Sequence, residues 1–256
     1  MNLIDAHTHL HFPELESDLD GVLDRAQKAG VKYFINTGTN ADTSWKAIQL
    51  AQKYPFIFAA IGIHPNESHH VPPNELADFD ELIKEPKVVA VGEIGLDYYR
   101  NESPPATQRQ VLTNFFKIAE RYQKPIVLHI RDAYDDVIRM LRDFFKPPIR
   151  GMSHCFSGTL DQMDQLIHLG LHISFAAPVT YPKNDALREA AKLCPMHRIF
   201  VETDAPYLPP QSFRGKRNEP AYLIETAKKI AEVKQISLEE LAGQVLGNAR
   251  ELFGIG

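Results

Sequence analysis

Eight short apolar segments recur along the chain, each followed by a polar or glycine-containing end and then by an amphipathic helical pattern. The segments are rich in Val, Ile and Phe and mostly lack alternation of polar and apolar residues, which is typical of parallel strands buried on both faces. The predicted strands are 3–9, 33–37, 56–63, 88–92, 126–130, 151–155, 172–176 and 199–203. With 256 residues, each unit has about 32, the size of one strand–helix step. This pattern predicts an α/β fold, a (β/α)8 TIM barrel, with residues 1–256 as a single domain.

Helical patterns fill the intervals between these strands. Apolar residues keep the helical period over 19–26, and Gly30 follows where a helix would end. A long helix is expected over 107–122, and Ser237 with Glu240 matches a capping box that opens the last helix. The main alternative is an open doubly wound sheet. That fold would carry a glycine-rich phosphate turn after an early strand, and the sequence has none.

Composition and charge narrow the class of protein. Hydrophobic residues make up 44% and charged residues 24%, which suits a soluble enzyme. No apolar run approaches the ~20 residues of a membrane span, and the N-terminus lacks the pattern of a secretory signal. We therefore expect a cytoplasmic protein with no membrane partner, and a monomer. The net charge of −5 argues against wrapping long nucleic acid by charge alone, although two bound cations would concentrate positive charge in one pocket.

Polar residues stand at the carboxyl ends of most predicted strands. In a barrel these ends share one mouth, where active sites are found. One marker residue per strand, 21 to 36 residues apart, gives the series His7, Thr37, His64, Glu93, His129, His154, Phe175 and Asp204. Six of these eight are His, Asp or Glu, so side chains scattered along the sequence are predicted to converge on one site.

The first predicted strand carries the most specific local pattern for a metal site. His7 and His9 share one side of a strand, so both imidazoles would face one pocket. Asp5 has the same parity one layer deeper and could accept a ring N–H. Glu93 ends a buried apolar run, where a carboxylate is costly unless it is paired or bound to metal. Each of these observations has a structural alternative. His7 and His9 could be two ordinary polar residues near the N-terminus, and Glu93 could be paired with an Arg or a Lys.

Three further strand ends complete a possible ligand set. His129 and His154 alone are more often hydrogen-bonded core histidines than ligands. Asp204 suits a ligand that also takes a proton from water, with Glu202 below it as a supporting group. These residues suffice to coordinate two four-coordinate cations if Glu93 binds both of them, because a carboxylate has two oxygens. One site would be His7, His9, Glu93 and Asp204, and the other Glu93, His129 and His154. Mixed N and O ligands suit Zn²⁺ or Mn²⁺, and Mg²⁺ less well.

Residues around the expected mouth suggest substrate contacts. His64 is as readily a substrate contact as a structural residue. Arg131 and Arg217 carry guanidinium groups that match phosphate geometry, although the loop around Arg214, Lys216 and Arg217 could simply be solvated. Tyr98, Tyr99 and Tyr207 could stack on bases or pack the rim. The thiol of Cys155, opposite in parity to His154, is expected to face the helix layer and to be inert.

The whole chain resembles the TatD-type metal-dependent hydrolases, a branch of the amidohydrolase-like barrels. The resemblance rests on IDAHTHL (4–10), GIHP (62–65), GEIGLDYY (92–99), LHIRDA (128–133), SHCFSG (153–158), ETDAPYL (202–208), RNEP (217–220) and NARELFG (248–254). It implies metal ligation by His7, His9, Glu93, His129, His154 and Asp204. Many related barrels have a carbamylated Lys in the place of Glu93, so a glutamate there favours this family.

The resemblance implies a hydrolase with two divalent ions and with Asp204 and Glu93 as catalytic residues. Family members include deoxyribonucleases, some of them 3′→5′ exonucleases, so DNA ends or short oligonucleotides are the expected substrates, with RNA as an alternative. Others have been linked to removing D-amino acids from tRNA, which keeps ester or amide hydrolysis open, for example by a D-aminoacyl-tRNA deacylase. The intact ligand set disfavours a third possibility, a binding scaffold without chemistry.

Overall fold

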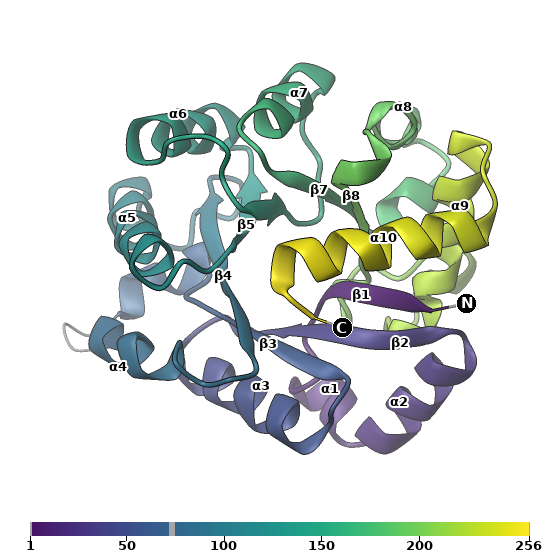
Figure 1. Ribbon diagram of the computed structural model, residues 1–256, viewed down its shortest axis with the longest axis horizontal. Coiled ribbons are helices and arrows are strands. Elements are labelled where there is room, and N and C mark those ends of the chain that lie inside the picture. Colours follow the sequence, from purple (N-terminus) through teal and green to yellow (C-terminus); the bar gives the residue numbers. More distant parts are fainter. Residues whose placement is uncertain (1, 72–74, 256) are drawn as a thin grey trace.

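Eight parallel strands follow one another around a single sheet in sequence order. The sheet belongs to a computed structural model that describes residues 2–71 and 75–255 (Figure 1). Its last strand returns to its first: the Asp204 N–H donates to the His7 carbonyl at 3.0 Å, and the His9 N–H donates to the Ala205 carbonyl at 2.8 Å. The predicted (β/α)8 barrel is therefore confirmed. An open doubly wound sheet is excluded because the strand order never reverses.

Strands and helices alternate around the barrel. The strands are β1 (Leu3–Thr8), β2 (Val31–Thr37), β3 (Ile57–Ile61), β4 (Val88–Asp97), β5 (Ile126–Arg131), β6 (Gly151–Ser153), β7 (His172–Phe175) and β8 (Ile199–Val201). The α-helices are α1 (Pro13–Glu16), α2 (Leu19–Lys28), α3 (Ala41–Lys53), α4 (Glu75–Leu82), α5 (Pro105–Tyr122), α6 (Tyr134–Phe144), α7 (Leu160–His168), α8 (Asp185–Leu193), α9 (Leu223–Lys234) and α10 (Leu238–Phe253). Short 3-10 turns are η1 (Pro65–His70), η2 (Ala177–Thr180), η3 (Met196–Arg198), η4 (Gln211–Phe213) and η5 (Pro220–Tyr222).

Seven predicted strands agree with the structure to within two residues at each end, but β4 runs five residues further than predicted. The glycines at 92 and 95 look like end signals in the sequence. Gly95 instead lies inside the strand at φ 153°, where a Cβ would clash with the carbonyl oxygen of His129. Glycine is thus needed for β4 to approach β5, and Glu93 lies mid-strand rather than at a strand end.

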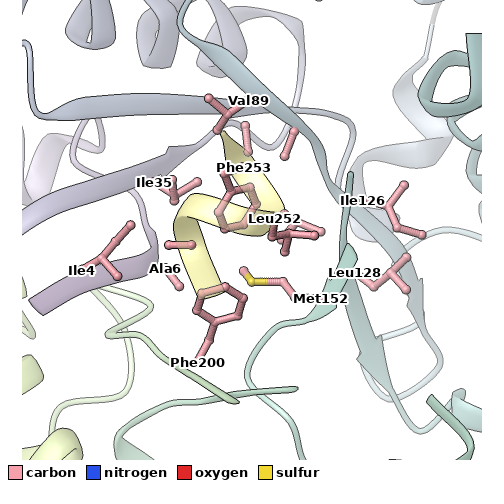
Figure 2. Close-up of a cluster of buried hydrophobic side chains, with 14 of the residues drawn as sticks. Ile4, Ala6, Ile35, Val89, Ile126, Leu128, Met152, Phe200, Leu252 and Phe253 are labelled. Atoms are coloured by element: carbon pink, nitrogen blue, oxygen red, sulfur yellow. The ribbon is translucent and has the colours of Figure 1, made fainter. Parts of the chain in front are cut away.

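The amino-terminal end of the barrel is closed by α10. Ser237 caps the start of this helix, because its hydroxyl accepts the Glu240 N–H at 3.1 Å. The helix crosses the barrel in Figure 1. Its last apolar residues, Leu252 and Phe253, lie in the core with Met152 and Phe200 (Figure 2). The Arg150 guanidinium, just before β6, donates to the Leu252 carbonyl at 2.7 Å. The carboxyl end of the barrel is therefore the end left for a functional site. In the described ranges, no helix combines the length and apolar character needed to cross a bilayer.

Candidate metal centre

The six predicted ligands meet at the carboxyl end of the barrel around the Glu93 carboxylate. Glu93 Oε2 lies 3.3 Å from His7 Nε2 and 3.7 Å from His9 Nε2. Glu93 Oε1 lies 2.7 Å from His129 Nδ1 and 2.9 Å from His154 Nε2. Each oxygen thus faces a different pair of imidazoles, which is the arrangement that a bridging carboxylate requires.

Asp204 completes the first of these two groups. Its Oδ1 lies 3.4 Å from His9 Nε2 and 3.7 Å from His7 Nε2. The residue lies three positions after the end of β8 and has a φ of 56°, a left-handed conformation that Asp tolerates better than most residues. Its side chain is 13% exposed, whereas that of Glu93 is 4% exposed. Asp204 therefore stands at the solvent side of the cluster and Glu93 at its base.

Local backbone features place Glu93 in the middle. The β4–β5 register shifts between Val91 and Ile94, so the strand carries an irregularity at the glutamate itself. The Glu93 N–H donates to the Gly38 carbonyl at 3.2 Å, which ties this irregular segment to the end of β2. Such irregularities re-aim side chains and recur next to active sites. The carboxylate consequently points across the barrel mouth toward the histidines of β1, β5 and β6.

Hydrogen bonds on the far side of the rings decide which nitrogen faces the cluster. His9 Nδ1 lies 2.7 Å from the Thr37 carbonyl, which only accepts, so Nδ1 carries the hydrogen. His154 Nδ1 lies 3.2 Å from Glu202 Oε1 in the same way. The Nε2 lone pairs of both rings then point at carboxylate oxygens, an arrangement that needs a proton or a cation between them. The donor set therefore fits divalent cations, with outer acceptors that orient the ligands.

Burial and neighbouring charges act in opposite directions on the pKa values of the residues in the cluster. Burial opposes protonation of His154, but the negative charges of Glu93 and Glu202 outweigh it and raise the pKa of His154 well above its usual value. Burial alone would raise the pKa of Glu93, yet the surrounding imidazoles hold it well below its usual value. Glu93 is thus ionised at neutral pH. Cation binding must displace protons from the histidines, so the affinity for metal should increase with pH.

Asp5 does not contact the ring of His7, contrary to the expectation from parity. Its oxygens accept the Thr203 N–H at 2.9 Å, the Thr203 hydroxyl at 2.5 Å and the His7 backbone N–H at 3.4 Å. In the part of the chain that the structure describes, His7 Nδ1 is buried with no hydrogen-bond partner. Asp5 therefore joins β1 to the end of β8 through backbone groups, which its parity in the strand does not reveal.

Asp5 offers a stability prediction, because burial raises its pKa to about 8 from 3.8. Asp5→Asn keeps one oxygen for the two backbone N–H groups and should change the free energy of unfolding by less than ~1 kcal/mol below pH 3.8, where the carboxyl is mostly protonated in both the folded and the unfolded chain. Asp5→Ala leaves those donors unpaired and should cost ~1–3 kcal/mol. The folded wild type retains a proton that the unfolded chain releases, so its stability should fall relative to Asp5→Asn as the pH rises from 3.8 to about 8. Urea unfolding of both variants across this range tests it, and a pH-independent difference would count against a neutral Asp5.

Two residues of the cluster are not among the ligands predicted from the sequence. His64 Nε2 lies 3.4 Å from Glu93 Oε1, which puts this histidine beside His129 rather than outside the cluster. Asp97 Oδ2 lies 3.3 Å from His129 Nε2. Asp97 was missed because the strand was expected to end at Gly92. The sequence nonetheless indicates this site residue by its spacing, because Glu93 and Asp97 share one face of the longer strand.

The rim residues differ in how freely they are presented. Tyr99 is 63% exposed and Tyr207 is 49% exposed. The Arg131 guanidinium lies 3.9 Å from the centre of the Tyr99 ring. The Tyr98 hydroxyl donates to Asp136 at 2.7 Å, so this tyrosine is held by a neighbouring side chain. Among the three tyrosines, Tyr99 and Tyr207 are thus the ones available to a ligand.

Two expectations made from the sequence change with the structure. Arg217 donates to the Glu14 carbonyl and lies 3.6 Å from Glu219, so its guanidinium is already engaged. Cys155 lies beyond β6 at a φ of 44°, so strand parity no longer applies to it. Burial and then the nearby charges of Asp204 and Glu202 raise the pKa of its thiol well above the usual value. The Cys155 backbone N–H donates to Glu202 Oε1 at 2.6 Å, which ties this residue to a carboxylate next to the cluster.

The chain is similar to known proteins over nearly its whole length. The family described as TatD related DNase matches residues 4–254. The uncharacterized metal-dependent hydrolase YabD of Bacillus subtilis is 37% identical over 99% of both chains. The 3'-5' ssDNA/RNA exonuclease TatD of Edwardsiella piscicida is 37% identical over 98% of this chain and 99% of its own.

A solved structure extends the likeness to three dimensions. The crystal structure of YjjV, a TatD homolog from Escherichia coli K12, matches with a TM-score of 0.95 and 32% identity, over 99% of this chain and 98% of that one. The family match spans the segment from β1 to the end of α10, which holds every residue of the cluster around Glu93. The chain therefore belongs to the TatD family of metal-dependent hydrolases.

Proposed function

We propose that this protein uses two divalent cations to hydrolyse phosphodiester bonds at the ends of single-stranded DNA or RNA. The observation that carries the proposal is the placement of Glu93, whose two oxygens face two separate pairs of histidines. Two-metal sites of this kind stabilise both the attacking and the leaving oxygen of a displacement at phosphorus. A relative of similar length is named a 3'-5' ssDNA/RNA exonuclease, which supports the choice of substrate class.

The ligands divide between the two cations as their distances suggest. His7, His9 and Asp204 would hold one cation, His129 and His154 the other, and Glu93 both. Bound Zn²⁺ or Mn²⁺ would supply Lewis acidity and lower the pKa of water near the phosphate. Glu202 keeps the His154 ring in place through its contact with Nδ1.

Asp204 is proposed to accept the proton of the attacking water. It is the more exposed of the two carboxylates among the proposed ligands, so it borders the space that substrate and water must enter. Burial raises its pKa, but the contact with His9 and the charges of the nearby histidines outweigh that effect and lower it. The carboxylate is therefore ionised, and ready to take a proton, over the neutral pH range.

His64 is proposed to donate a hydrogen bond to a substrate oxygen. Its Nδ1 accepts the Asn66 N–H at 3.1 Å, so the ring hydrogen is on Nε2, which faces the site. Burial lowers the pKa of His64 to about 3, which keeps the ring neutral. His64 thus offers a fixed N–H beside Glu93.

The rim is proposed to hold the nucleotide next to the reacting phosphate. Arg131 is the phosphate contact that we favour, because it lies two residues beyond His129 and its only cation–π partner, within the described ranges, is an exposed tyrosine. Tyr99 and Tyr207 offer ring faces to unpaired bases. Arg217, which the sequence suggested as a phosphate contact, is assigned here to holding the loop near Glu219 and α1.

Tyr207→Ala should separate base recognition from chemistry. Loss of one stacked base should lower kcat/KM on a single-stranded oligonucleotide by the equivalent of ~1–3 kcal/mol, about 5- to 150-fold. Hydrolysis of bis(p-nitrophenyl) phosphate, which has no base, should stay within about twofold of the wild type. Leu193→Ala, an equally exposed residue at the end of α8, is the control and should change neither rate. Equal losses on both substrates would remove Tyr207 from the substrate site.

The choice of bond cleaved is tested by substrate competition. Metal-loaded protein is given single-stranded DNA, RNA and an ester-linked aminoacyl nucleotide at equal concentrations. We expect release of mononucleotides from the two oligonucleotides and little hydrolysis of the ester. Preferential cleavage of the aminoacyl ester would overturn the proposal in favour of a deacylase, and would leave the metal site itself unaffected.

A further inference from the structure

His64 and His129 lie side by side but are bonded in opposite ways. Their ring centroids are 4.4 Å apart, and both rings reach Glu93 Oε1. The outer nitrogen of His64 accepts a backbone N–H, whereas the outer nitrogen of His129 faces the Asp97 carboxylate at 3.3 Å. An ionised carboxylate only accepts, so His129 must carry its hydrogen on Nε2. His64 thus presents an N–H to the glutamate, whereas Nδ1 of His129, 2.7 Å from the same oxygen, requires a cation or a second proton between the two atoms.

Asp97 is held in this acceptor state by its surroundings. Its side chain is 1% exposed. Oδ1 accepts the Tyr99 N–H at 3.0 Å and the Arg100 N–H at 2.9 Å, and Oδ2 accepts the Asn66 side-chain amide at 3.3 Å. With His129 these make four donors around one carboxylate, so it has no need of a proton.

The position of Asp97 is also fixed from the helix layer. The Gln108 side chain, on α5, accepts the Asp97 N–H at 2.8 Å and donates to the Asp97 carbonyl at 3.1 Å. The same amide donates to the Ser103 carbonyl at 2.7 Å. Asn66 joins the two histidines to this frame, because its backbone N–H binds His64 and its side chain binds Asp97. A single buried network therefore determines the hydrogen positions of both rings.

We propose that Asp97, aided by Asn66, is a positioning residue that directs the Nδ1 lone pair of His129 toward the second cation while His64 remains a hydrogen-bond donor. The proposal rests on the two-cation site proposed above. It predicts that His64, Glu93 and His129 do not bind a cation together, although they lie close enough to form a metal-binding group. His64 has no lone pair to offer on the side that faces Glu93.

Nuclear magnetic resonance of the wild type loaded with ¹¹³Cd²⁺ and labelled with ¹⁵N-histidine tests the proposal directly. We expect scalar coupling of cadmium to Nδ1 of His129, a protonated Nε2 on the same ring, and no coupling to either nitrogen of His64. Coupling to Nε2 of His129, or to His64, would overturn it. This measurement needs no variant, so it stands even if changes at Asp97 impair folding.

Asp97→Asn provides the matching variant. Its amide would present hydrogens to His129 Nε2 and so favour the tautomer with Nδ1 protonated, which cannot bind the cation. We expect the affinity for the second cation to fall ~10–100-fold, as for other outer partners of metal ligands, with the first unchanged within about twofold. Asp136→Asn, a rim carboxylate bonded to Tyr98 and Arg139, is the control and should bind both cations normally.

The outcomes separate this inference from the proposed function. If the wild type binds one cation in all, the two-cation function fails. If the wild type binds two and Asp97→Asn binds both with unchanged affinity, the positioning role of Asp97 fails and the function stands.

Discussion

Glu93→Ala is expected to remove metal binding from both halves of the site and to lower hydrolysis by about 10³-fold or more. The carboxylate faces the four proposed histidine ligands through its two oxygens, so no other side chain can replace it for either half. Losing a Lewis-acid contribution of several kcal/mol corresponds to a rate loss of this order. Metal content after dialysis and oligonucleotide hydrolysis at saturating Mn²⁺ are the two measurements.

Two controls make this result specific. His154→Ala should chiefly affect the second cation, because His154 contacts only Oε1 of Glu93. The metal-free Glu93→Ala protein should unfold near the temperature of the metal-free wild type, since the barrel core and α10 are remote from the site. Two full equivalents of metal in Glu93→Ala would rule out the bridging role.

Asp204→Asn is expected to lower the rate by more than it lowers metal occupancy. The amide keeps the size of the side chain and one oxygen toward His7 and His9, but it cannot accept the proton of the attacking water. Proton transfer by a positioned base is worth ~10²–10⁴-fold, so a loss in this range should persist at metal concentrations that restore full occupancy. Rate and metal content that fall in equal proportion would show that Asp204 serves only as a ligand.

The arrangement of the strands could be predicted from the sequence because it follows from periodicity. Buried parallel strands read as uninterrupted apolar runs, and a barrel places each strand end at one mouth, so His7, Glu93 and Asp204 could be brought together without knowing any distance. The alternative fold, an open doubly wound sheet, requires a glycine-rich phosphate turn that the sequence does not contain. The convergence of the ligands is thus a consequence of topology.

Other features depended on contacts that the sequence does not encode locally. The length of β4 was underestimated because a glycine required by close strand approach looks the same as a terminating glycine, and Asp97 was lost with the strand end. Asp5 has the parity of a metal-supporting group, yet Thr203 competes for its oxygens from the other side of the barrel. Arg217 is similarly engaged by a residue of α1, about 200 positions away in the sequence.

Titration of the metal-free wild type with Mn²⁺, with binding and nucleotide release followed in the same samples, tests the central claim most directly. Single-stranded DNA labelled at its 5′ end is the substrate. The proposed site predicts that two equivalents bind, that hydrolysis rises with their occupancy, and that a chelator abolishes it. Hydrolysis that survives removal of the metal, or full activity with a single bound equivalent, would contradict it.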